Sequence, residues 1–153
     1  MRMPEVGDQA PDFETLDDSG QAVRVSDFRG RRVVLYFYPR ADTPGCTKEA
    51  CSFRDDFSAY ESKNVVILGV SPDTERAQAK FRAKYKLPFH LLADPDHAIS
   101  EMYGTWGLKK FMGREFMGVR RTTFVIDERG DISHVFEGVQ PAEHSAEVLA
   151  GLT

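Results

Sequence analysis

The chain has 153 residues and a hydrophobic share of 41%, enough for one hydrophobic core, so a single domain over residues 1–153 is expected. The formal net charge is -4, with 20 Lys and Arg against 24 Asp and Glu and no long run of either sign, which disfavours binding to nucleic-acid phosphates. No segment approaches the ~18 apolar residues of a membrane-spanning helix or resembles a signal-peptide core, so a cytoplasmic location away from membranes is expected.

The first predicted elements are a hairpin and a buried strand. Residues 12–16 and 21–25 are short extended candidates on either side of an Asp-Asp-Ser-Gly turn sequence, which predicts an N-terminal β-hairpin. Residues 33–38 read Val-Val-Leu-Tyr-Phe-Tyr, a continuous β-branched and aromatic run. That pattern is typical of a strand buried on both faces of a central sheet, and it ends at Pro39.

An amphipathic helix is predicted next. Its apolar residues recur three or four positions apart, at Ala50, Phe53, Phe57 and Tyr60. The charged residues of this segment, Glu49 among them, fall largely on the other side, so they are expected to face solvent.

The rest of the chain alternates strands with helices. In order, the pattern predicts a buried strand at 65–70, a helix at 74–85, an edge strand at 90–92, a helix at 99–103, a hairpin of 122–126 with 132–136, and a closing helix at 142–152. Four glycines interrupt residues 104–118, which are expected to form an ordered loop. This order predicts an α/β protein with a central mixed sheet flanked by helices, as in the thioredoxin-like fold.

The only two cysteines, Cys46 and Cys51, follow the first buried strand. In a reducing compartment such a pair is more often catalytic or metal-binding than structural, although a single cysteine can also be a small buried hydrophobe. Thr43 is a good N-cap residue and Pro44 suits the first helical position, which places Cys46 inside the first turn. Unpaired backbone N–H groups and the helix dipole stabilise a thiolate there, and the thiolate is the nucleophilic form.

The sequence around Cys46 resembles a known active site. Residues 36–47 read YFYPRADTPGCT and contain the pattern P-x-x-x-T-x-x-C, which closely resembles the active-site loop of the peroxiredoxins. The resemblance covers nearly the whole chain and is greatest to the bacterioferritin-comigratory-protein, or peroxiredoxin Q, branch. It implies a thioredoxin-like fold and a peroxidase that reduces hydrogen peroxide and organic hydroperoxides without a metal or an organic cofactor.

The resemblance also implies a role for each site residue. Cys46 attacks the peroxide O–O bond and becomes a sulfenic acid, and Cys51 resolves it as an intramolecular disulfide. The Thr43 hydroxyl orients the peroxide, and Pro39 shields the site from water. For Pro39 a routine strand-terminating role fits the sequence equally well.

Two adjacent arginines compete for the remaining role. Strand alternation sends Arg120 and Arg121 to opposite faces without showing which face carries Cys46. The family pattern selects Arg121 as the cation that stabilises both the thiolate and the leaving oxygen. Arg120 is interpreted as a solvated charge at the end of a strand.

Disulfide formation requires the predicted helix to change. Positions five apart in an intact helix have Cα atoms roughly 8.6 Å apart, beyond the ~7 Å limit for a disulfide, so the helix must unwind locally. The resemblance implies that thioredoxin, or glutaredoxin, then reduces the disulfide. A monomer or a weak homodimer is expected.

Several alternatives stay open. A thiol–disulfide oxidoreductase usually has C-x-x-C, and a thioredoxin-like copper chaperone C-x-x-x-C with a distant His, so both fit the cysteine spacing poorly. The four histidines show no metal-ligand spacing with the cysteines and are expected to be surface or hydrogen-bonded side chains. The apolar residues of the predicted loop could form a peroxide-side wall, a reductase-docking patch, a subunit contact or core filling. They are Trp106, Phe111, Met112, Phe116 and Met117.

Overall fold

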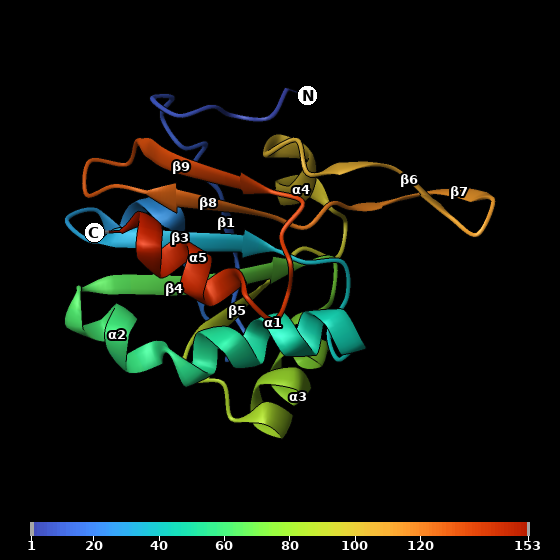
Figure 1. Ribbon diagram of the computed structural model, residues 1–153, viewed down its shortest axis with the longest axis horizontal. Coiled ribbons are helices and arrows are strands. Elements are labelled where there is room, and N and C mark those ends of the chain that lie inside the picture. The colour runs from blue at the N-terminus through green and yellow to red at the C-terminus, as the bar shows by residue number, and fades with distance from the viewer. Residues whose placement is uncertain (1, 153) are drawn as a thin grey trace.

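Five strands form the central sheet of the computed structural model, which describes residues 2–152 (Figure 1). In spatial order they are β5 (His90–Ala93), β4 (Val65–Ser71), β3 (Arg32–Phe37), β8 (Thr122–Ile126) and β9 (Ile132–Glu137). Strands β3, β4 and β5 run parallel, whereas β8 and β9 pair antiparallel. The sheet is therefore mixed, which confirms the predicted fold class.

Helices and smaller elements cover both faces of this sheet. On one face lie α1 (Pro44–Asp55), α2 (Phe57–Ser62), α3 (Glu75–Tyr85) and α5 (His144–Gly151). On the other lie the hairpin of β1 (Glu14–Leu16) and β2 (Ala22–Arg24), the 3-10 helix η1 (Val25–Phe28) and α4 (Ala98–Met102). Successive side chains of β3 enter different cores, Val34 and Tyr36 under α1 and Val33 and Leu35 on the opposite face. The strand is thus buried on both faces, as its sequence predicts.

Most predicted elements are present within a few residues of their predicted bounds, but one helix is divided. The segment predicted as a single amphipathic helix forms α1 and α2, separated at Asp56. The Ser145 hydroxyl donates to the Asp56 carboxylate at 2.7 Å. Asp56 therefore ends α1 and also ties the break to the start of α5.

The prediction of a loop at 104–118 is wrong. These residues contain an antiparallel hairpin of β6 (Trp106–Phe111) and β7 (Arg114–Val119). Its two-residue turn has positive φ at both Met112 and Gly113, as a tight β-hairpin turn requires. The hairpin projects from the body of the protein (Figure 1), and Phe111, Met112, Phe116 and Met117 are exposed rather than filling the core.

Two glycines that pair across the strands make this hairpin difficult to predict from the sequence. Gly107 pairs with Gly118, and both resemble strand breakers when only the pattern is considered. A Cβ at Gly118 would lie 3.1 Å from Lys109 Cδ, and one at Gly107 would lie 3.3 Å from the Arg120 guanidinium. The glycines therefore leave room for long side chains to cross the ribbon.

Within residues 2–152, no helix is both long and apolar enough to cross a membrane.

Candidate active site

The first turn of α1 presents free backbone donors beside Cys46. Thr43 is the N-cap residue with extended backbone, and the first helical bond runs from Thr47 N to Thr43 O at 2.8 Å. Within the described chain, the N–H groups of Gly45 and Cys46 have no recorded partner. The Thr43 hydroxyl does not cap the helix but donates to Arg40 O at 2.9 Å. This helix start can therefore donate to an anion or to a polar substrate oxygen.

Residues 39–43, which join β3 to α1, are held from the β4–α3 side. The Ala41 N–H donates to Asp73 Oδ2 at 2.8 Å. Asp42, in the left-handed region with φ of 58°, accepts from Lys84 Nζ at 2.8 Å and from the Tyr85 hydroxyl at 2.7 Å. These contacts fix the loop and hence the direction in which α1 begins.

Arg121 lies directly against the buried Cys46 thiol. Its Nη2 is 3.3 Å from Cys46 Sγ, and its Nη1 donates to Glu49 Oε1 at 2.9 Å. Gly45 permits this approach, because a Cβ there would lie 3.1 Å from Arg121 Nη2. Cys46 is only 1% exposed, so the guanidinium acts on the sulfur where water screens little.

Glu49 is a site residue that the sequence reasoning placed wrongly. It was expected on the solvent side of the helix, but it is fully buried beside Arg121. Burial raises the pKa of Glu49 to about 7, although the Arg121 charge and hydrogen bond act to lower it. Its Oε2 has no partner within residues 2–152. The missed signal is spacing, since Glu49 follows Cys46 by three residues and thus shares its helix face.

Aromatic rings line the core beneath the thiol. Tyr36 of β3 stacks on Phe53 of α1 at 4.8 Å between centroids and on Tyr38 at 5.4 Å. Burial raises the pKa of Tyr36 well above its usual value, so its hydroxyl stays protonated. This apolar floor lowers the local dielectric and strengthens the interaction of Arg121 with a thiolate.

Two other predicted site residues, Pro39 and Cys51, lie on either side of Cys46 along the chain. Cys51 is a free, half-buried cysteine in the same helix as Cys46, which is also free. Pro39 is half-buried two residues beyond β3. The structure therefore groups Cys46, Thr43 and Arg121 at the start of α1 and leaves Cys51 further along it.

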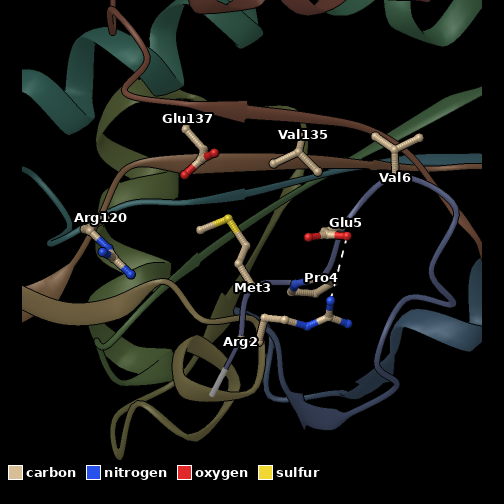
Figure 2. A pocket seen from close by; sticks show the side chains of 8 residues that line it. All are labelled: Arg2, Met3, Pro4, Glu5, Val6, Arg120, Val135 and Glu137. Atoms are coloured by element: carbon tan, nitrogen blue, oxygen red, sulfur yellow. Dashed lines mark ion pairs between the residues drawn. The ribbon is translucent and has the colours of Figure 1, made fainter.

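Arg120 points to a different part of the molecule. Its Nη2 donates to Gly104 O at 2.9 Å. It lines a cavity of about 420 Å³ beside the N-terminal segment. Figure 2 shows Arg120 at the edge of this group of residues and the ion pair of Arg2 with Glu5. Arg120 is exposed, as expected for a strand-end charge. Of the two adjacent arginines, it is Arg121 that contacts the cysteine.

A thioredoxin-like fold with a buried cysteine at a helix N-terminus, contacted by an arginine, defines the class of thiol-based peroxidases. A cysteine in this arrangement can act as a sulfur nucleophile, and the arginine and the free N–H groups beside it can donate to a departing oxygen.

Comparison with known proteins then identifies the family. Residues 6–135 match the AhpC/TSA family. The chain is 45% identical to peroxiredoxin Bcp of Bacillus subtilis over 148 residues, 97% of this chain and 94% of that protein. The structure of peroxidoxin BcpB from Mycobacterium tuberculosis superposes with a TM-score of 0.87 at 37% identity, covering 99% of this chain and 97% of the other. The structure of a Xylella fastidiosa PrxQ mutant superposes with a TM-score of 0.92 at 28% identity, covering 99% of this chain and 96% of the other.

The chain therefore belongs to the AhpC/TSA family and is a peroxiredoxin, a thiol-dependent peroxidase that uses a peroxide and a thiol reductant. The alternatives of a thiol–disulfide oxidoreductase and a copper chaperone are not favoured.

Proposed function

We propose that Cys46 is the attacking thiol of this peroxidase, that Cys51 resolves its sulfenic acid, and that thioredoxin reduces the resulting disulfide. The substrates are hydrogen peroxide and organic hydroperoxides. The observation that carries the proposal is the 3.3 Å contact between Arg121 Nη2 and the buried Cys46 sulfur.

In the first step the Cys46 thiolate attacks one oxygen of the peroxide and the O–O bond breaks. The sulfur becomes a sulfenic acid, and the departing oxygen leaves as water or an alcohol after it takes up a proton. Arg121 and the free N–H groups of Gly45 and Cys46 donate to the oxygens as charge moves onto them. Because the Thr43 hydroxyl proton is engaged by Arg40 O, its lone pairs are left to accept from the peroxide O–H, while Pro39 limits access of water.

In the second step the Cys51 thiol attacks the sulfenic sulfur, and water leaves as the disulfide forms. Both cysteines belong to α1, and five helical positions separate Cα atoms by roughly 8.6 Å, more than the ~7 Å that a disulfide spans. The helix must therefore open between the cysteines. Amide hydrogen exchange through residues 47–53 is expected to speed up on oxidation, and unchanged exchange would contradict this step.

The disulfide must be reduced before the next turnover. Thioredoxin is the proposed reductant, with glutaredoxin as the second candidate. A cytoplasmic location accords with the need for both cysteines to be regenerated as thiols. We propose that the protein acts as a monomer or a weak homodimer.

Intact mass after one equivalent of peroxide tests the assignment of the two cysteines. The wild type is expected to lose 2 Da, which corresponds to one internal disulfide. Cys51→Ser is expected to stop at the sulfenic acid, trapped by a dimedone adduct, or to overoxidise. Cys46→Ser is expected to consume no peroxide, and turnover by that variant would overturn the proposal.

A further inference from the structure

The β6–β7 hairpin ends two residues before Arg121, which contacts the Cys46 thiol. It leads directly into β8, whose first residue Thr122 pairs with Phe37, the last residue of β3. Strand β3 continues into the loop before α1, so the hairpin projects from the same edge of the sheet as the thiol (Figure 1). Phe111 is 67% exposed, Met112 87% and Phe116 45%. Large apolar side chains grouped this way on a surface indicate an interaction site.

Strand register divides the hairpin into two faces. Phe111 pairs with Arg114 and Lys109 with Phe116, and because opposed residues share a face, these four side chains form one surface, here called the Phe111 face. A Cβ at Gly118 would lie 3.1 Å from Lys109 Cδ and 3.6 Å from the Phe116 ring, which confirms that Lys109 and Phe116 share this side.

The opposite face of the hairpin has other surroundings. It carries Leu108 paired with Met117. Met117 and Trp106 line a hollow that they share with Met102 of α4. The base of this second face therefore lies beside α4, while Leu108 is 55% exposed and Met117 52%.

The Phe111 face continues to the active site through Lys109. The Lys109 ammonium donates to Val119 O at 3.0 Å, two residues before Arg121. Burial and the Arg121 charge lower the pKa of Lys109, whereas the charge of Cys46 acts to raise it. The ammonium therefore lies beside the chain segment that carries Arg121 to the Cys46 sulfur.

The Phe111 face is positively charged on a chain whose net charge is -4. Lys110 and Glu115 pair at 3.5 Å on the other face and offset each other. The Phe111 face keeps Lys109 and Arg114, for which no ion pair is recorded within residues 2–152. A complementary partner would present an apolar surface with acidic side chains around it.

We propose that the Phe111 face is the docking surface for the protein dithiol that reduces the Cys46–Cys51 disulfide, a partner with an apolar and acidic surface beside its own cysteines. The inference rests on the proposed function. One partner thiolate attacks a disulfide sulfur and forms a mixed disulfide, and the second partner thiol displaces it. The partner is oxidised to a disulfide while Cys46 and Cys51 return to thiols, a transfer of two electrons and two protons.

The test compares two reductants on protein first oxidised with one equivalent of peroxide. Thioredoxin is the protein reductant, and dithiothreitol is the small dithiol that needs no docking surface. For Phe111→Ser/Phe116→Ser, the rate with thioredoxin divided by the rate with dithiothreitol is expected to fall about tenfold, since buried aromatic anchors dominate binding at protein interfaces. Leu108→Ser, on the other face of the same hairpin, is expected to leave this ratio within about twofold.

Charge supplies a second measurement. Arg114→Glu is expected to slow thioredoxin association by about tenfold at low salt and to lose most of that effect at high salt. Lys110→Glu, on the opposite face, is the matched control.

Three results would contradict the docking surface. One is an unchanged ratio for the double Phe variant, and another is an equal loss in Leu108→Ser. The third is a wild-type dimer that the double Phe variant converts to a monomer in sedimentation, which would assign the Phe111 face to self-association. Failure of the wild type to lose two thiols on oxidation would instead refute the proposed function.

Discussion

Buried polar groups on the two faces of the central sheet are satisfied to different degrees. On the face covered by α4, the Tyr103 hydroxyl donates to Pro11 O at 2.6 Å, and Asp94 accepts from the N–H and hydroxyl of Ser100 at 2.9 and 2.8 Å. On the face covered by α1, the Tyr36 hydroxyl and Glu49 Oε2 have no partner within residues 2–152. Both groups belong to the surroundings of Cys46.

The unpaired groups lie near the thiol and lower the stability of the α1 face, whereas the groups compared with them on the α4 face are hydrogen-bonded. An unpaired buried polar group costs about 1–3 kcal/mol, so the α1 face holds groups that a face built for stability alone would omit. Glu49 is retained where it holds Arg121 against the thiol. On the α4 face, Tyr103 and Asp94 are hydrogen-bonded and support the sheet from its other side.

The largest effect is expected for a substitution that removes the contact between Arg121 and the Cys46 thiol on the α1 face. Arg121→Met removes the donor 3.3 Å from Cys46 Sγ. Loss of one such donor slows a reaction by about 10²–10³-fold, or about 2.7–4 kcal/mol, and the second-order rate with hydrogen peroxide is expected to fall by that factor in stopped-flow measurements. The control is Arg120→Met, which removes a bond to Gly104 O. An equal loss in the control would show that the arginines act through the fold.

The next effect concerns His144 of α5, a third polar group on the α1 face. It is buried, and its Nε2 lies 2.6 Å from Thr123 Oγ1. Burial, followed by the Arg121 charge, lowers the pKa of His144 to about 4 from the ordinary 6.5. The unfolded chain therefore binds the proton first as pH falls. The contribution of this group to stability is complete above pH 6.5 and is lost as pH falls toward 4, by about 3 kcal/mol in all.

Urea unfolding of the wild type and His144→Gln between pH 7.5 and 4 measures this loss. Glu49, whose pKa is raised to about 7, acts in the opposite direction, since stability from that group is complete below its ordinary pKa and lost as pH rises through 7. Both proteins keep Glu49, so the difference between their two curves isolates His144. Parallel curves would contradict the prediction.

The sequence predicted the parts of the fold that follow from local pattern. The run at 33–38 is buried on both faces, and α1 begins at Pro44 directly after Thr43 as predicted, although the Thr43 hydroxyl does not cap the helix. The β6–β7 hairpin was missed because opposed Gly107 and Gly118 resemble strand breakers unless the partner strand is known.

Site residues from distant segments are harder to predict. Periodicity could not choose between Arg120 and Arg121, because the choice depends on how β8 pairs with β3. Glu49 was grouped with the charged residues opposite the apolar positions of the helix, and its partner, Arg121, lies 72 positions away in the chain. The family resemblance selects Arg121, and the packed structure shows that Arg121 contacts both Cys46 and Glu49.

The smallest expected effect compares one buried tyrosine from each face. Tyr36→Phe removes an unpaired hydroxyl, so the free energy of unfolding is expected to stay unchanged or to rise by up to about 1 kcal/mol. Tyr103→Phe removes a hydroxyl bonded to Pro11 O and is expected to lower that free energy by about 1 kcal/mol or more. Urea unfolding at pH 7 measures both changes in the free energy of unfolding. The prediction is that Tyr103→Phe lowers this free energy and Tyr36→Phe does not. Equal losses would show that the Tyr36 hydroxyl is satisfied in solution, and the contrast between the two faces would then rest on Glu49 alone.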